Sequence, residues 1–270
     1  APAVRAAFTP ASDRQRDLGR PIVIVDAAHS IGGTAGGVQV GRLSDATVFS
    51  LHSVKNVTTG EGGAISLNLP APFDNEAVLP GLRSLALNGQ NKSAFEKNQT
   101  GAWRYDIVEQ GLKVNMPDVN AAIGLAQIRR YQSDLLPDRK RIVDRYEAAL
   151  QQYPWAIRPV LDDETRASSR HLYLLRIAGA DEAARDAIID RISAREVGVN
   201  VHYLPMPTLT LFRNLGYRIE DYPVTAALAA NEITLPVYNG LTDAQVDEVL
   251  AAVIAAVAEV LGTDQSGAAQ

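Results

Sequence analysis

Three short strand-like segments near the start of the chain constrain its fold more than any other feature. Residues 21–26 read Pro-Ile-Val-Ile-Val-Asp, an unbroken apolar run that ends in an acid. Such runs are typical of central strands buried on both faces of a parallel sheet. Residues 46–50 and 63–67 form two further strand-like segments, and a glycine cluster precedes the second of them. We therefore expect an α/β fold with polar groups at its strand ends.

The segments around these strands predict loops and helices. Residues 27–41 are rich in glycine, so we expect a loop or turn there. Residues 116–130 place apolar side chains at helical spacing, with Pro117 in the first turn, where a missing N–H costs little. A second helix is expected over 137–153, because Pro154 stops it.

After this point the pattern changes to a smaller α+β unit. We expect a strand at 171–178, a helix at 181–195 and another strand at 197–203. A long terminal helix is expected over 242–261, opened by Thr242 as its cap.

Composition excludes several classes of function. The chain of 270 residues can form one large domain or two unequal ones, and its net charge of −5 without a basic run disfavours nucleic acid as a partner. It has no cysteine, which excludes disulfide scaffolds, zinc–thiolate sites and thiol nucleophiles and fits a cytoplasmic enzyme. No apolar run approaches the roughly 20 residues needed to cross a bilayer, so we expect no membrane span.

The strongest candidates for functional residues are Asp26, Ser50 and Lys55. Asp26 and Ser50 end two expected strands, and Lys55 lies on the loop after the second. Ligands usually bind at strand ends of α/β sheets. An acid there suits a protonated pyridine nitrogen, a lysine suits an aldehyde, and a serine suits a phosphate. Taken singly, however, such an Asp is most often a cap or ion-pair partner, and such a Lys a solvated charge.

Longer motifs favour a ligand-binding role for these three residues. Two segments, Val25-Asp-Ala-Ala-His-Ser-Ile-Gly32 and Phe49-Ser-Leu-His-Ser-Val-Lys-Asn-Val-Thr-Thr-Gly-Glu-Gly-Gly63, resemble the DegT/DnrJ/EryC/StrS-type sugar aminotransferase family. Residues 111–124, 169–173, 198–203 and 233–238 resemble later signatures of the same family. The resemblance covers about residues 21–260. It implies fold type I of the pyridoxal-phosphate (PLP) enzymes, with a mixed or mostly parallel sheet in a partial large domain.

The same resemblance implies a division of the chain. Residues 1–20 match nothing in the family, residues 21–135 correspond to the remainder of the PLP-binding large domain, and residues 136–261 correspond to a small C-terminal α+β domain. The small polar tail at 262–270 is expected to be disordered. Family members have a long segment before the position of residue 21, so we expect either a truncated chain or a second chain that supplies it.

Roles carry over from the family to matching positions. Lys55 corresponds to the lysine that bonds to the cofactor and shuttles the proton, and Asp26 to the acid that faces the pyridine nitrogen. His29 corresponds to a polar residue near the phenolic oxygen, with structural support as the alternative role. Ser50 corresponds to a phosphate-binding serine.

Other positions have less specific roles. Lys113 and Asn115 lie in the loop that reaches the partner subunit's cofactor phosphate, and the motif leaves open which of them makes the contact. His52 and Asn56 flank the lysine and, with His202, are expected on the substrate side, although His52 also suits packing behind the lysine. No residues are expected to bind a metal.

The resemblance implies transamination of a keto group on a nucleotide-linked sugar, with glutamate as the amino donor and a homodimer as the assembly. One alternative is a non-catalytic homologue or partner subunit that retains the fold. A PLP-dependent sugar dehydratase is less favoured, because that branch replaces the lysine with histidine and this chain has Lys55. A simple ligand-binding module would not need Lys55 for binding.

Overall fold

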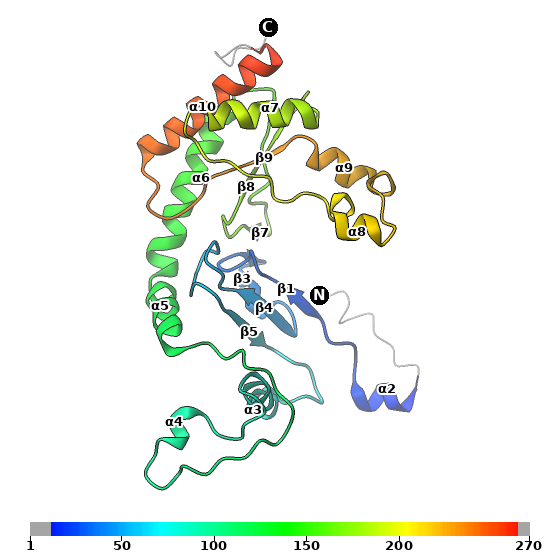
Figure 1. Ribbon diagram of the computed structural model, residues 1–270, viewed down its shortest axis with the longest axis vertical. Helices are drawn as coiled ribbons and strands as arrows, with labels where there is room; N and C mark the ends of the chain where they lie inside the picture. Colours follow the sequence, from blue (N-terminus) through cyan, green and yellow to red (C-terminus); the bar gives the residue numbers. More distant parts are fainter. Residues whose placement is uncertain (1–11, 264–270) are drawn as a thin grey trace. The chain divides into compact units, whose positions relative to one another are not determined.

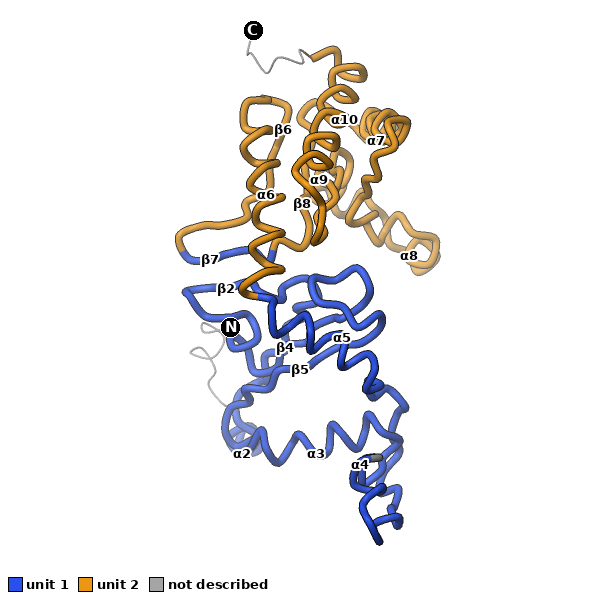
Figure 2. Tube along the Cα trace, turned by 90° about the vertical axis from the view of Figure 1, so that its left-hand side faces the viewer, with its two compact units in different colours: residues 1–131, 165–169 blue, residues 132–164, 170–270 orange. Residues whose placement is uncertain are grey.

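The computed structural model describes residues 12–263, which form two compact units (Figure 2). The described part of the first unit comprises residues 12–131 and 165–169. The second comprises residues 132–164 and 170–263. Most of the tail for which disorder was expected lies outside the described residues. Within the described part, no helix is both long and apolar enough to cross a bilayer.

A three-stranded mixed sheet lies at the centre of the first unit (Figure 1). Strand β1 (Ile24–Asp26) runs parallel to β4 (Ala46–Ser50), and β4 pairs antiparallel with β5 (Gly63–Leu67). The strands expected at 46–50 and 63–67 are thus confirmed, whereas β1 is shorter than the expected 21–26.

The expectation that β1 is buried on both faces is wrong. The strand order is β1-β4-β5, so β1 is an edge strand, and Ile24 is 67% exposed. Val48 and Ile65 pair across β4 and β5 on the same face as Ile24, and both are also exposed. An apolar run shows a preference for burial, but burial needs a covering layer. Among the described residues, these three side chains are left uncovered.

Residues 27–41, expected to form a loop, contain a small hairpin. Strands β2 (Thr34–Ala35) and β3 (Val38–Gln39) pair antiparallel, and the 3-10 turn η1 (Val40–Arg42) follows. Gly36 and Gly37 join the strands with φ angles of 57° and 72°, the left-handed backbone that a tight two-residue hairpin turn requires. Strand β7 (Arg166–Ala167) adds to the other edge of β2.

The described helices of the first unit are α2 (Asp13–Leu18), α3 (Asn75–Ala86), α4 (Ala94–Lys97) and α5 (Asp118–Arg129). Helix α5 confirms the helix expected at 116–130 and begins directly after Pro117. Helix α3 was not expected. The side chain of Asp74 accepts a hydrogen bond from the Glu76 amide and caps it.

A separate antiparallel sheet forms the second unit. Its order is β6 (Ala156–Ile157), β8 (Tyr173–Ile177) and β9 (Glu232–Leu235). The π-helical turn η2 (Tyr131–Leu135) leads into α6 (Leu136–Leu150). Strand β8 and helix α6 confirm the elements expected at 171–178 and 137–153; β8 is shorter at both ends, and α6 begins slightly before its expected start and ends before its expected end.

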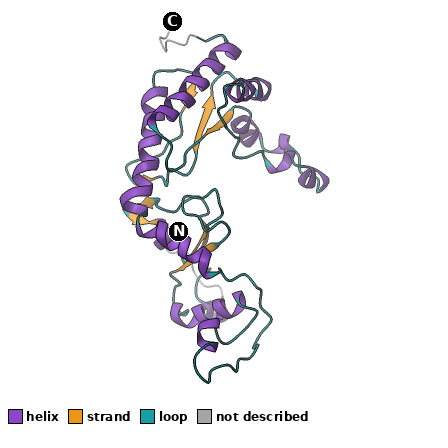
Figure 3. Cartoon of the chain, turned by 60° about the vertical axis from the view of Figure 1, so that its left-hand side comes forward, coloured by secondary structure: helices purple, strands orange, loops and turns teal. Residues whose placement is uncertain are grey.

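Helices cover one face of this sheet. Helix α7 (Glu182–Ser193) contacts β9 and α10 (Asp243–Leu261), and α10 also contacts α6. Figure 3 shows these helices beside the strands of the unit. Thr242 and Gln245 form a reciprocal capping box at the start of α10, which confirms the expected cap. The large apolar core of the described residues lies here, between residues 142 and 257.

The strand expected at 197–203 is wrong. Only Asn200 pairs with β9, through a single bridge to Thr234. The ladder would continue through the amide of His202, two residues further on. This amide donates to the side-chain carboxylate of Glu232 at 3.0 Å instead of to a strand carbonyl. The ladder therefore ends after one bridge. The chain continues through η3 (Met206–Thr208), α8 (Thr210–Asn214), η4 (Ile219–Asp221) and α9 (Pro223–Ala229).

Candidate active site

Asp26 and Ser50 lie at the same end of the first unit's sheet, where β1 and β4 have their carboxyl ends. They end β1 and β4, which run parallel, and the Ala27 amide continues the pairing by donating to the Val48 carbonyl at 2.8 Å. The Asp26 carboxylate is exposed and accepts the Ala28 amide at 3.0 Å. The Ser50 hydroxyl accepts the His52 amide at 3.3 Å. This end of the sheet therefore presents one carboxylate and one hydroxyl in a fixed backbone frame.

Lys55 lies on a loop that is closed at its base by backbone hydrogen bonds. The Leu51 amide donates to the Gly62 carbonyl, and the Thr59 amide donates to the Leu51 carbonyl, both at 2.9 Å. Gly62 has a φ of 157°, and a Cβ there would lie 2.4 Å from the Thr59 hydroxyl oxygen. A side chain at this position would force the loop open.

The Lys55 side chain is half-buried, and within the described part of the chain its ammonium has no hydrogen bond or ion pair. Its amide donates to the His52 carbonyl at 2.9 Å, which fixes the turn that carries the side chain. A lysine side chain on a fixed backbone turn and without a counter-ion is suited to covalent or proton-transfer chemistry.

One face of α5 holds the lysine loop from the other side. The Gln127 amide group donates to the Thr58 carbonyl at 2.7 Å and accepts the Thr58 amide at 3.1 Å. Asn120 donates to the Thr59 carbonyl at 2.6 Å. Gly124 lies between these two residues, and a Cβ there would be only 2.7 Å from the Thr59 methyl carbon. The loop is therefore clamped directly onto the helix.

Sequence reasoning did not identify this clamp. Asn120, Gly124 and Gln127 recur at intervals of four and three residues, which places them on one helical face. The helix was predicted from its apolar positions alone. Polar or small residues at the same spacing are a signal that could have revealed a contact surface for the motif loop.

Asn56, expected on the substrate side, is buried and holds chain segments together. Its amide donates to the Ser169 carbonyl at 2.7 Å and to the Tyr131 hydroxyl at 3.2 Å. Tyr131 in turn donates to the Ile31 carbonyl at 2.7 Å, and the Ser169 hydroxyl donates to the His29 carbonyl at 2.5 Å. These bonds fix the backbone of the motif around His29 relative to the lysine loop.

The His52 ring lies at the surface of the lysine loop. Its Nε2 atom is 3.3 Å from the Ser53 hydroxyl and 3.5 Å from the Glu61 carboxylate. Since the ring is partly exposed and Glu61 largely so, this contact orients the imidazole without burying a charge.

Lys113 and Asn115 lie close together in the first unit. The Lys113 ammonium donates to the Asn115 side-chain oxygen at 2.6 Å, and both residues are exposed. The Val114 and Asn115 amides donate to the Ala86 carbonyl at the end of α3, each at 3.0 Å. The exposed pair thus projects from a backbone that is fixed to α3.

His202 belongs to the second unit. Its Nδ1 atom lies 2.9 Å from the Thr234 hydroxyl, which donates to Glu232 at 2.5 Å. Burial raises the pKa of the Glu232 carboxyl group above its ordinary value, against the lowering effect of the hydrogen bonds it accepts from the Thr234 hydroxyl and the His202 amide. In the described residues, no group of three or more histidine or acidic side chains is placed to hold a metal ion.

Comparisons with known proteins agree with this arrangement. The sequence matches the model of the DegT/DnrJ/EryC1/StrS aminotransferase family over residues 19–254. The spore coat polysaccharide biosynthesis protein SpsC of Bacillus subtilis is 33% identical over 238 residues, which are 86% of this chain and 58% of SpsC.

Solved structures show the same relationship. Spr1654 from Streptococcus pneumoniae, assigned as a sugar aminotransferase and solved in its PMP form, is 39% identical with a TM-score of 0.84 over 95% of this chain and 64% of its own. The aminotransferase TlmJ from Streptoalloteichus hindustanus is 25% identical with a TM-score of 0.73, over 92% of this chain and 62% of its own.

This chain therefore spans about three fifths of the length of these relatives. The fold expected from the resemblance, fold type I of the PLP-dependent enzymes, is confirmed. Because the family match covers most of the sequence, the chain belongs to the DegT/DnrJ/EryC1/StrS aminotransferase family.

Proposed function

We propose that this chain carries the lysine-bearing part of a PLP-dependent sugar aminotransferase. The proposed reaction transfers an amino group from glutamate to a keto group of a nucleotide-linked sugar. The observation that supports it best is the half-buried Lys55 side chain on a clamped loop that follows β4, whose last residue, Ser50, lies at the same end of the sheet as Asp26. The names of the relatives, which refer to sugar aminotransferases and polysaccharide biosynthesis, support the substrate class.

The side chains at this end of the sheet fit PLP by their chemistry. The cofactor has an aldehyde, a ring nitrogen that binds a proton, and a phosphate. Lys55 provides an amine for the aldehyde, Asp26 a carboxylate for the protonated nitrogen, and Ser50 a hydroxyl whose proton is available to a phosphate oxygen. When bound, PLP supplies an electron sink that stabilises negative charge on the substrate carbon.

The chain's own residues would perform three tasks. Lys55 Nζ would hold the aldehyde and later remove and return the proton on the substrate carbon. The Asp26 carboxylate would accept a hydrogen bond from the ring N–H and keep that proton in place. Gln127 and Asn120 would keep the lysine loop from shifting, since proton transfer requires its donor and acceptor within hydrogen-bond reach.

We assign supporting roles to the remaining site residues. His29 would lie near the phenolic oxygen of the cofactor, and His52 and His202 near the sugar. Asn56 would position the loop through its two hydrogen bonds. Lys113 or Asn115 would contact the cofactor phosphate of a partner subunit in a homodimer or of a complementing chain, which their exposure permits.

Absorbance and borohydride reduction test the proposal. Wild-type protein mixed with PLP should show a visible absorbance band, and borohydride should fix the cofactor to a peptide that contains Lys55. Lys55→Ala should lose both signals. The control Lys92→Ala removes another lysine of the same unit and should retain both. A Lys55→Ala protein with the wild-type spectrum and label would refute the role of this lysine.

A further inference from the structure

The small sheet of the second unit has two chemically different faces. Tyr173, Leu175 and Ile177 on β8 are fully buried in the apolar core. The alternate positions of β8, Leu174 and Arg176, lie on the other face, because side chains alternate along a strand. In an antiparallel sheet with one face packed on a core, the other face is commonly polar, and here it carries the Arg176 guanidinium.

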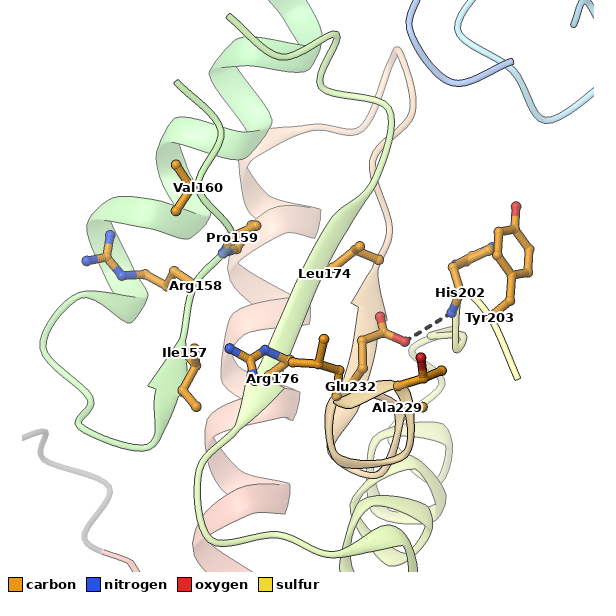
Figure 4. A pocket seen from close by; sticks show the side chains of 12 residues that line it. Ile157, Arg158, Pro159, Val160, Leu174, Arg176, His202, Tyr203, Ala229 and Glu232 are labelled. Carbon is orange, nitrogen blue, oxygen red and sulfur yellow. Dashed lines mark hydrogen bonds between the residues drawn. The ribbon is translucent and has the colours of Figure 1, made fainter. Parts of the chain in front are cut away.

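A pocket of about 460 Å³ lies on this second face, entirely within the second unit (Figure 4). Its size is in the range of small-molecule sites. Its lining combines apolar side chains with a few polar ones, as is typical of such sites. The residues used below are Ile157, Pro159, Leu174, Arg176, Leu228 and Glu232.

The acidic group of the pocket is already satisfied. Glu232 is 6% exposed, and its two oxygens accept hydrogen bonds from the His202 amide and the Thr234 hydroxyl. The guanidinium of Arg158 at the pocket wall is likewise committed, because it forms an ion pair with Glu147. Neither group therefore needs a ligand to balance it.

Arg176 is different. Its Cα is directly opposite that of Glu232 on the neighbouring strand, yet Figure 4 shows its head group turned toward Ile157 and the Glu232 carboxylate turned toward His202. Within the described chain the Arg176 guanidinium has no hydrogen bond or ion pair, although it is partly buried. A partly buried charge among apolar walls is stabilised when an anion pairs with it.

We propose that this pocket binds a small organic anion with a flat or apolar body, and that Arg176 is its anchor. A guanidinium donates two parallel hydrogen bonds to a carboxylate or a phosphate, so either group satisfies the anchor. Ile157, Pro159, Leu174 and Leu228 would pack against the body of the ligand. The inference concerns second-unit residues only, and its test needs neither PLP nor Lys55, although the pocket includes His202, which we also place near the sugar of the proposed reaction.

Nuclear magnetic resonance of the histidine rings provides a direct test with the full chain. The sequence has only four histidines, and His202 lines the pocket, so a His202→Gln variant identifies its signal. Phenyl phosphate and benzoate serve as probes that share a ring and differ in the anion. Benzyl alcohol is the neutral control. Saturable shifts of the His202 signal are expected with at least one anion and not with the alcohol.

Arg176→Gln should weaken binding of the responding anion by about tenfold to a hundredfold, the effect of losing a charge-assisted pair. Arg213→Gln removes an exposed arginine of α8 outside the pocket and should bind like wild type. Leu228→Trp keeps Arg176 but fills the pocket, so a folded variant should also lose binding. Response to phenyl phosphate alone identifies a phosphate ester as the ligand class, and response to benzoate alone a carboxylate.

Two outcomes would overturn the proposal. One is the absence of a saturable His202 shift with both anions. The other is equal affinity of wild type and a folded Arg176→Gln protein. Inorganic phosphate provides a further comparison, because a ligand held by its apolar body as well should bind more tightly than the bare anion.

Discussion

The contact between Gly124 and the lysine loop predicts that Gly124→Ala destabilises the loop in the wild-type protein but stabilises it when the Thr59 methyl group is removed. A Cβ on Gly124 would lie 2.7 Å from the Thr59 methyl carbon, whereas ordinary contacts start near 3.4 Å. Thr59 is buried, and its hydroxyl donates to the Glu61 carbonyl at 2.8 Å, so the methyl group cannot easily rotate away. Gly124→Ala should therefore push the loop from the helix.

Two opposing free energies decide the size of the effect. Alanine in a helix interior is about 1 kcal/mol more favourable than glycine. Overpacking a buried contact costs about 1–3 kcal/mol. The net effect of Gly124→Ala is a local destabilisation of up to about 2 kcal/mol. In a Thr59→Ser background the methyl is absent and the hydroxyl remains, so the same substitution should stabilise by up to about 1 kcal/mol.

Amide hydrogen exchange of the peptide spanning residues 51–62 measures this effect. The Leu51 and Thr59 amides close the loop, so their exchange rates report its opening. A change of about 1.4 kcal/mol appears as a tenfold change in rate. In the wild-type background Gly124→Ala should accelerate exchange. In the Thr59→Ser background the same substitution should slow it. If Gly124→Ala slows exchange equally in both backgrounds, α5 does not press on the loop and the clamp is wrong.

Three further predictions concern stability. Thr242→Ala removes the capping box of α10 and should lower the free energy of unfolding by about 1 kcal/mol in urea, whereas Thr242→Ser should lower it little. Burial raises the pKa of the Tyr146 hydroxyl above its ordinary value, so the folded state favours the neutral form. Its contribution is complete below about pH 10 and is lost as pH rises above it, so Tyr146→Phe should reduce the alkaline loss of stability in urea titrations at about pH 8 to 11. Asp45 is buried and accepts two hydrogen bonds from Arg20, so Asp45→Ala should destabilise β1 and β4 and accelerate their hydrogen exchange. Unchanged protection would contradict it, and adding Arg20→Met should restore part of the loss.

Local sequence signals predicted the elements that depend on local chemistry. Strands β4 and β5 are short runs bounded by polar or glycine residues, and α10 begins with a cap that its own residues complete. The bridge at Asn200 was mistaken for a strand because the residue that ends the ladder, Glu232, is distant in the sequence. The exposure of β1 was mispredicted for a similar reason. Burial depends on a covering layer, which an apolar run does not specify.

The candidate site divides in the same way. The motif predicted Lys55, Asp26 and Ser50 as site residues, and Asp26 and Ser50 end two strands as expected; that these strands are adjacent and parallel is seen only in the structure. The hydrogen bonds from Gln127 to the lysine loop, and from Asn56 to the Ser169 carbonyl, join residues far apart in the chain. Such pairings depend on tertiary contacts that periodicity within one segment does not reveal.

The confinement of the large apolar core to the second unit has a practical consequence for spectroscopy. The chain has two tryptophans: Trp155 is 6% exposed within that core, and Trp103, in the first unit, is 68% exposed. Indole emission shifts when a ring passes from an apolar setting into water, so unfolding changes the emission of Trp155 much more than that of Trp103. A sigmoidal fluorescence melt would therefore report unfolding of the second unit. Unfolding of the first unit, which carries Lys55, would change tryptophan fluorescence very little.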